Sequence, residues 1–349
     1  MNETSTQLLN KRRQTIMLTP RARFFVNLFF ATILPWPNTL WAAQAAEKVR
    51  VAYPSVSMPM APWWIAQDKG IFRQEGLDAE SMYIRGDSTV VQALVGGDIQ
   101  AGYAGAAPVA AAVAQGAPVV IIAVPANRMG YLLVTREPIK DPRELYGKKF
   151  AISSFGGSSE VATRLGLEKI GVDPNKVVML QIGGSPDRIA AIKRGTVDGS
   201  LLSANELIGA GGMGFHTIFD FTKSDLEYPY DVLYVRKQFV AEKRKAASGM
   251  IRAFMKALWF MQENQDESVK IAGRWLRSSD IEALRRQWKY IAFQFHQEIP
   301  YPTEAGFKLA LGGLAATNPK AAALRMQEVV DVSLIDELVK EGFFKKHKQ

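Results

Sequence analysis

Three turns rich in glycine and hydroxyl side chains are the residues best suited to bind a small solute. They are residues 86–89 (GDST), 153–159 (SSFGGSS) and 183–187 (GGSPD), and a helical pattern follows each of them. Unpaired N–H groups and the helix dipole attract anions at such N-termini, and each contact contributes about 0.3 to 1 kcal/mol when exposed. Paired glycines allow close backbone approach, which favours ligand contact in SSFGGSS. For Ser88 and Ser185, helix capping alone is an open alternative.

Two further segments follow predicted strands and should face the same crevice, because open α/β sheets bind ligands at the carboxyl ends of their strands. Ser57 and Trp63 follow the first strand and offer a hydroxyl group and an aromatic wall, whereas Trp64 is expected in the core. Gly105 and Ala106 end the third strand and leave room for a ligand. The corresponding positions in the second half are Ser203 and Asn205.

Residues with the spacing of a catalytic or metal site are missing from the sequence. It has no cysteine, and His216, His296 and His347 stand far apart. It has no nucleophile elbow, phosphate-binding loop or HExxH motif. A GxGxxG match at residues 209–214 ends a helical pattern and precedes a strand pattern, which reverses the dinucleotide-binding order. We therefore expect no catalytic residue, no cofactor and no metal ion.

An internal repeat contains two of the three turns. Residues 76–102 and 171–200 both read as a strand, a glycine-rich turn, an amphipathic helix, a glycine and a second strand. This repetition predicts two similar α/β lobes that face each other, with helix N-termini directed into the gap. The alternative is that glycines after helices and hydroxyl residues before them are general features of α/β proteins and indicate no repeat.

Two polar joints divide the predicted strands into two groups. The first joint, residues 137–149, follows a strand at residues 131–136, and the second joint is residues 222–230. The expected domains are a first lobe of residues 46–138 and 230–349, helical in its C-terminal part, and a second lobe of residues 139–229. Two neighbouring crossings would form a hinge that closes around a ligand. A single rigid domain with two sheets is the alternative.

Residues 1–45 have the features of an export signal. A basic segment precedes the apolar run FFVNLFFATIL, which is too short to cross a bilayer. The tripeptide AQA at residues 43–45 fits a cleavage site, so we expect a periplasmic protein that begins at Ala46. Translation from Met17 and an N-terminal membrane anchor are the alternatives.

The net charge of +9 over 349 residues does not indicate nucleic-acid binding. Residues 1–45 hold five of the basic side chains against Glu3 alone, and elsewhere basic and acidic residues alternate along predicted helices. That pattern is typical of a solvated surface. We therefore expect no nucleic-acid partner. The mature chain is expected to be a monomer that binds a small solute.

Five segments of the chain match the sequence pattern of a known family. They are PMAPWWIAQDKGIFRQEGLDAE, VQALVGGDIQAGYAGAAPVAAAVAQG, LYGKKFAISSFGGSSEVATRLGLEKIGVDP, AAIKRGTVDGSLLS and LIDELVKEGFF. In these segments the chain resembles type 2 periplasmic substrate-binding proteins of ABC importers, in the branch for nitrate, sulfonates, taurine and thiamine-pyrimidine precursors. The resemblance implies an α/β fold of two lobes, each a mostly parallel sheet flanked by helices, with a helical C-terminal region. It also implies capture of a small solute and its delivery to a permease in the inner membrane.

By that resemblance the solute lies between two walls. The first wall is Ser57, Trp63, Ser88, Thr89, Gly105 and Ala106, and the second is Ser154, Gly156, Gly157, Ser158, Ser159, Ser185 and Asn205. No arginine stands where it is expected to clamp a sulfonate, so neutral and zwitterionic solutes stay open beside anions. A sensor subunit for a receptor kinase is one alternative function. An enzyme of thiamine-pyrimidine synthesis is another, although the chain lacks the cysteine-rich motif of those enzymes.

Overall fold

Residues 46–209 and 213–345 are described by a computed structural model of the chain. The predicted export signal, its cleavage site at Ala45 and residues 210–212 of the GxGxxG match lie outside these described residues. Within them, no helix is both long and apolar enough to cross a membrane.

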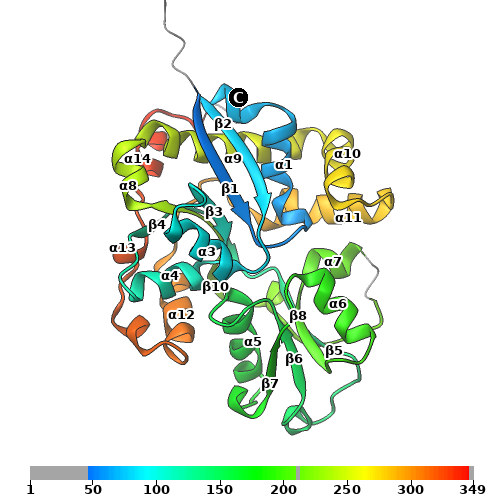
Figure 1. The fold of residues 1–349 in the computed structure, drawn as a ribbon. Coiled ribbons are helices and arrows are strands. Elements are labelled where there is room, and N and C mark those ends of the chain that lie inside the picture. Colours follow the sequence, from blue (N-terminus) through cyan, green and yellow to red (C-terminus); the bar gives the residue numbers. More distant parts are fainter. Residues whose placement is uncertain (1–45, 210–212, 346–349) are drawn as a thin grey trace, which may run out of the picture. The chain divides into compact units, whose positions relative to one another are not determined.

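Five strands form the first sheet, in the order β2-β1-β3-β10-β4 (Figure 1). They are β1 (Glu47–Tyr53), β2 (Leu77–Tyr83), β3 (Ala101–Ala104), β4 (Val119–Arg128) and β10 (Glu227–Arg236). Strand β1 runs parallel to β2 and β3, whereas β10 runs antiparallel to β3 and β4. Nearly every residue of β4 and β10 is buried, because helices and neighbouring strands cover both faces.

The second sheet repeats this arrangement, in the order β7-β6-β8-β5-β9. Its strands are β5 (Tyr131–Thr135), β6 (Lys149–Ile152), β7 (Val178–Gln181), β8 (Gly199–Ser203) and β9 (His216–Asp220). Strand β6 is parallel to β7 and β8, and β5 is antiparallel to β8 and β9. Each sheet is therefore mostly parallel with one reversed strand, which confirms the predicted fold class.

The internal repeat corresponds to the same structural unit in each lobe. The first copy is β2, α3 (Asp87–Gly96) and β3, and the second is β7, α6 (Ser185–Lys193) and β8. The two strands of each copy flank one parallel strand, which is β1 in the first sheet and β6 in the second. The repeat is thus confirmed in topology as well as in sequence.

The chain passes between the sheets twice, from β4 to β5 and from β9 to β10 (Figure 1). The assignment of the strand at residues 131–136 to the first lobe is wrong, because β5 pairs with β8 and β9. The first crossing lies instead at residues 129–130. The polar segment after β5 holds a short 3-10 helix, η2 (Pro142–Leu145), whose first turn Asp141 caps. A polar segment can be a surface loop within one lobe as well as a crossing between lobes, which explains why the first crossing was misplaced. The other predicted domain boundaries remain predictions.

Helices cover both sheets. In the first lobe these are η1 (Met58–Met60), α1 (Ala61–Asp68), α2 (Ile71–Gln74), α3 and α4 (Ala106–Ala114). In the second lobe they are α5 (Ser158–Lys169), η3 (Pro174–Lys176), α6, α7 (Ala204–Gly209) and η4 (Phe221–Lys223).

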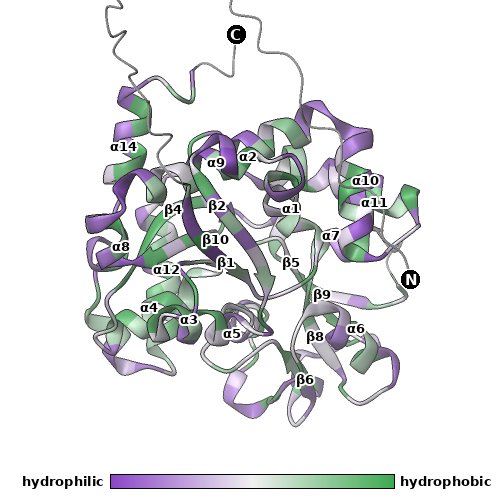
Figure 2. Cartoon of the chain, turned by 45° about the horizontal axis from the view of Figure 1, so that its top comes forward, coloured by the Kyte–Doolittle hydropathy of each residue, from purple (hydrophilic) through white to green (hydrophobic). Residues whose placement is uncertain are grey.

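The C-terminal region is helical, as predicted. Its elements are α8 (Lys237–Glu242), α9 (Arg244–Glu263), α10 (Gln265–Leu276), α11 (Ile281–Tyr290), the π-helix η5 (Ile291–Phe295), α12 (Glu304–Ala315), η6 (Pro319–Ala323), α13 (Met326–Val329) and α14 (Ser333–Lys340). Hydrophobic and hydrophilic residues alternate along α9, α10 and α14 (Figure 2), so each helix buries one face. Helix α9 packs against α1 of the first lobe, whereas α11 also contacts α7 of the second lobe.

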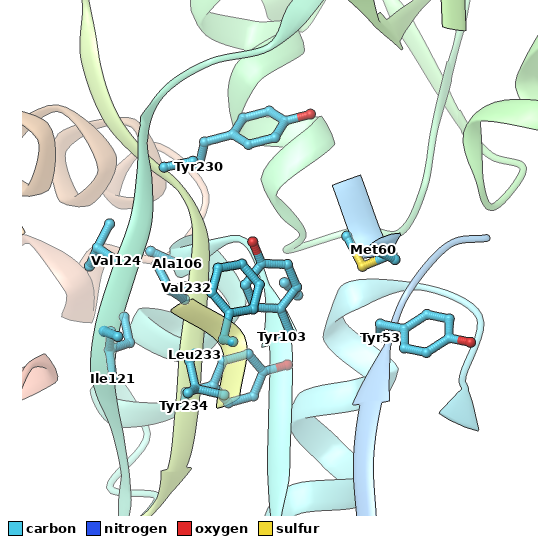
Figure 3. Packing of buried hydrophobic residues seen from close by; sticks show 14 of the residues in the cluster. Tyr53, Met60, Tyr103, Ala106, Ile121, Val124, Tyr230, Val232, Leu233 and Tyr234 are labelled. Carbon is cyan, nitrogen blue, oxygen red and sulfur yellow. The ribbon is translucent and has the colours of Figure 1, made fainter. Parts of the chain in front are cut away.

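The core of the first lobe gathers large aromatic side chains around α1 and β3. Trp63 is fully buried and its ring lies 5.3 Å from that of Tyr103 and 5.1 Å from that of Phe254. Trp64 is also fully buried and stacks on Trp275 at 5.6 Å. Figure 3 shows Tyr103 beside β10 residues of this core, with Tyr230 apart from them. A smaller apolar cluster around Ile192 and Leu202 supports the second lobe.

Candidate solute-binding site

A small cavity lies where residues of both sheets meet. Its volume is about 60 Å³. The first lobe contributes Pro54, Ser55, Ser57, Pro59, Met60, Asp87, Ala104, Gly105, Tyr230 and Asp231. The second lobe contributes Tyr131, Ser153, Ser159, Gly184, Ser185, Arg188 and Ser203. Most of these residues follow the carboxyl ends of parallel strands, where α/β sheets bind ligands.

Asp87 joins the two lobes beside the cavity. It opens α3 in the first lobe, and its Oδ2 accepts a hydrogen bond of 2.9 Å from the backbone N–H of Ser158, the first residue of α5. Its Oδ1 accepts from the hydroxyls of Ser153 at 2.9 Å and Ser154 at 3.4 Å. A carboxylate is favourable at a helix N-terminus because the dipole and free N–H groups attract negative charge. The carboxylate of Asp87 therefore occupies the place at the N-terminus of α5 where a bound anion would otherwise lie.

Further contacts hold the lobes together at the edge of the cavity. Ser88 donates a hydrogen bond of 3.1 Å to the carbonyl of Phe155 and accepts one of 3.2 Å from Ser154. Arg85 forms an ion pair with Asp187. These bonds run from α3 and the loop before it to the second lobe, so the two lobes are in direct contact beside the cavity.

Gly105 lies where the two lobes approach each other closely. A Cβ atom at this position would stand 1.9 Å from the hydroxyl oxygen of Ser158 and 2.6 Å from its Cβ. Its backbone is extended, with φ −73°, so alanine would fit the local conformation. Glycine is required at position 105 because the space between the lobes is too small for a side chain, and not because of its backbone conformation.

Arg188 is the cationic side chain of the cavity lining. It is buried, with 3% of its surface exposed. The guanidinium donates to the carbonyls of Gly183 at 2.6 Å and Leu201 at 3.2 Å, and to the hydroxyl of Ser185 at 3.0 Å. Arginine has five N–H donors, so these three bonds leave two of them unused. The sequence offered one signal, a charged residue on the buried face of α6 beside Ala191 and Ile192.

Two acids with raised pKa values lie near this part of the molecule, Asp231 in the cavity lining and the half-buried Glu206 near Arg188. Asp231 lines the cavity from β10, and burial, followed by the charge of Asp87, raises its pKa to about 8. Burial also raises the pKa of Glu206 in α7 to about 7, although the charge of Arg188 and a contact with Ser185 lower it in part. Both acids favour the protonated form when no cation is present.

Two tyrosines bring the lobes into aromatic contact at the cavity. The rings of Tyr131 and Tyr230 meet edge to face, with centroids 4.5 Å apart. In Figure 3 the Tyr230 ring points away from the core of the first sheet. Burial is the main cause that raises the pKa of Tyr131, and the charges of Asp87 and Asp231 add to it. Tyr131 is therefore close enough to interact with acids from two elements.

The structure brings part of the predicted site together. Ser57, Gly105, Ser159 and Ser185 line the cavity. Ser88, Ser154, Gly157 and Ser158 lie at the contact between the lobes, where a Cβ at Gly157 would meet Ser154 and Asp87 within 3.0 Å. The N-caps of α3, α5 and α6 are Gly86, Gly157 and Gly184, so Ser88 and Ser185 are not capping residues.

The other predicted site residues lie outside the cavity lining. Trp63 belongs to the aromatic core, and Ala106 is buried at the start of α4. Thr89 is exposed on α3. Gly156 has a positive φ of 69° and donates its N–H to Glu160. Asn205 is buried and donates a hydrogen bond of 3.2 Å to Gln287 of α11.

The described residues contain no group of three histidine, cysteine or acidic side chains placed to hold a metal ion. His216 is exposed at the start of β9. His296 contacts the carbonyl of Ile291 at 3.1 Å, and burial lowers its pKa to about 4. These positions fit structural or surface histidines.

The sequence of the chain is similar to that of a known periplasmic binding protein. The chain is 30% identical over 177 residues to the taurine-binding periplasmic protein of Escherichia coli strain K12, which covers 48% of this chain and only 53% of that relative.

Solved structures share the fold. The periplasmic nitrate-binding protein NrtA from Synechocystis PCC 6803 has a TM-score of 0.66 and 18% identity, over 85% of this chain and 89% of that one. The periplasmic aliphatic sulphonate binding protein SsuA from Escherichia coli has a TM-score of 0.63 and 17% identity, over 82% and 92%. The two-lobed periplasmic binding protein fold is thereby confirmed. The sequence profile described as NMT1/THI5 like matches residues 58–268, and the chain belongs to this family.

Proposed function

We propose that this protein is the solute-binding component of an ABC importer. It encloses a small solute between its lobes and delivers it to a permease. The likeness to a taurine-binding periplasmic protein and to the nitrate- and sulfonate-binding folds supports this class. A monomer exported to the periplasm, with neither catalytic activity nor nucleic-acid binding, completes the proposal.

One observation carries the proposal, the cavity lined from both sheets at the point where Asp87 joins them. A site divided between two bodies gains its full set of contacts only when they close. The two neighbouring crossings between the sheets are suitable hinge segments. Closure then gives a permease a surface that differs between the empty and loaded protein.

A thermal-shift screen with taurine, alkanesulfonates, nitrate, pyrimidines and aromatic carboxylates tests this function. A compound that binds the native state must raise the melting temperature. Mass spectrometry of small molecules released from the purified protein identifies a co-purified solute independently. The result against the proposal is a melting temperature that no compound raises, together with no released solute.

A cavity-filling variant shows whether a stabilising compound uses this site. A Cβ at Gly184 would have only ordinary contacts, with Ser55 and Pro186 at 3.7 Å, and its φ of −60° suits any residue. Gly184→Leu should therefore fold and should abolish stabilisation by the compound. Gly312→Leu is the matched control, because the space beside Gly312 in α12 is open. Equal stabilisation of both variants would place the compound elsewhere.

A further inference from the structure

One carboxylate oxygen of Asp231 has no hydrogen-bond donor among the described residues. The residue is only 5% exposed, and the oxygen without a partner there is Oδ2. Buried polar atoms are nearly always paired, because an unpaired one loses its hydration without compensation. Asp231 also lines the cavity, so a bound solute can reach this carboxylate.

Among the described residues, the cavity lining contributed by the first lobe contains no cationic side chain. Asp87 is a second acid, and its oxygens already accept from serines of the second lobe. Tyr103 of β3, Tyr131 of β5 and Tyr230 of β10 are the titratable hydroxyls that interact with Asp231. The first-lobe side of the cavity is therefore acidic and rich in hydroxyls.

The opposite side has the complementary charge. Arg188 lies in the second lobe and keeps two N–H donors beyond its three bonds to the protein. Ser185 and Ser203 place hydroxyls beside it, 3.3 Å apart. A solute that spans the cavity thus meets acceptors on the first lobe and donors on the second.

We propose that the solute is a compact zwitterion or polar amine, whose ammonium or cationic N–H group binds Asp231 and whose acceptor end faces Ser185 and Arg188. This inference rests on the proposed solute-binding function and narrows its substrate class. An ammonium group provides Oδ2 with its missing donor and balances the local negative charge. An anion without an N–H group, such as nitrate, offers no donor to Oδ2 and places a second negative charge near Asp87.

Binding should also release a proton, which a purely structural acid would not do. Burial, and then the charge of Asp87, raises the pKa of Asp231 to about 8, while Tyr103 lowers it in part. In the empty protein at pH 7, Asp231 therefore holds a proton, and a cation at the site would expel it. Calorimetry in buffers of different ionisation enthalpy measures this release, which approaches one proton per bound amine.

Matched compounds test the requirement for the amine. The probes are taurine with ethanesulfonate, β-alanine with propionate, 5-aminomethylpyrimidine with 5-methylpyrimidine, and nitrate alone. At least one amine should bind the wild type, and its amine-free partner should bind at least tenfold more weakly. Asp231→Asn keeps the shape of the side chain but should weaken the amine by at least tenfold and remove the proton release. Asp225→Asn is the control, because Asp225 is fully exposed and outside the cavity.

The outcomes separate this inference from the function on which it rests. If nitrate or an amine-free partner binds as tightly as an amine, the inference is overturned and the solute-binding function stands. The same holds if Asp231→Asn binds the amine as well as the wild type does. If no compound binds and no solute is released from the purified protein, both the inference and the proposed function fail.

Discussion

At the scale of single residues, two aspartates beside one cavity have different environments and different roles. Asp87 is satisfied by the N–H of Ser158 and by two serine hydroxyls. Asp231 lies among tyrosines with one oxygen unpaired. The first therefore stabilises contact between the lobes, whereas the second is left to interact with a solute.

The ligand-free protein should lose stability as the pH rises from about 6.5 to 8.5. Asp231 and Glu206 have folded pKa values raised to about 8 and about 7. Their stabilising contribution is therefore fully present below the ordinary carboxyl pKa of about 4, and it is lost progressively as the pH rises from there through the folded values. Each acid contributes a slope of up to about 1.4 kcal/mol per pH unit below its folded pKa. The pKa of His296 is lowered to about 4, so it acts in the opposite direction, but only below the ordinary histidine pKa of about 6.5. Urea unfolding across this range measures the slope.

Asp231→Asn should make this slope shallower, because the asparagine amide does not titrate. Asp225→Asn should leave it unchanged, since Asp225 is fully exposed. A wild-type free energy of unfolding that rises between pH 6.5 and 8.5 would contradict the assigned direction.

At the scale of secondary structure, helix α1 shows how an element can follow a site strand and still serve the core. Ser57, Pro59 and Met60 line the cavity, but the next turn buries both tryptophans among aromatic rings. Trp63 contacts Phe72, Tyr103 and Phe254, which all belong to the first lobe. Its role is therefore to fix α1 against β3 and α9.

Trp63→Phe should lower stability without changing solute affinity. Loss of the larger ring leaves a cavity in a close-packed core, at a cost of about 1 to 3 kcal/mol. Thermal unfolding should show a clear decrease in melting temperature, while the dissociation constant of a bound compound stays within twofold. Trp275→Phe, at a half-buried position, should cost less. If Trp63→Phe had an unchanged melting temperature and bound the compound tenfold more weakly, Trp63 would be a ligand-binding residue and this prediction would be wrong.

The fold was largely predictable because its signals are local. Strand periodicity, glycines after helices and the duplicated order of elements identify both lobes and the turns holding Gly105 and Ser185. Strand partners are not local, and so β5 was placed in the wrong sheet. Asp231 within the apolar strand YPYDVLYV and Arg188 within α6 were not identified as site residues from the sequence, and the structure shows that both are buried. Their convergence on one cavity depends on how the two sheets meet, which no local pattern encodes.

At the scale of the whole described unit, two similar lobes are joined by two crossings and by a contact centred on Asp87. The inner faces approach so closely at Gly105 and Ser158 that even one methyl group would separate them. Closure therefore depends on contacts made by residues of both lobes. A substitution at one of these contacts should change how far the lobes close without disturbing the core of either lobe.

Small-angle X-ray scattering of Gly105→Ala tests this central claim most directly. The wild type should contract when a stabilising compound is added, whereas Gly105→Ala should stay expanded and bind at least tenfold more weakly. The double variant Gly105→Ala/Ser158→Gly should contract again, because it removes the side chain that the new methyl group would meet. If Gly105→Ala gave the wild-type scattering curve and the wild-type affinity, the closed two-lobed site described above would be contradicted.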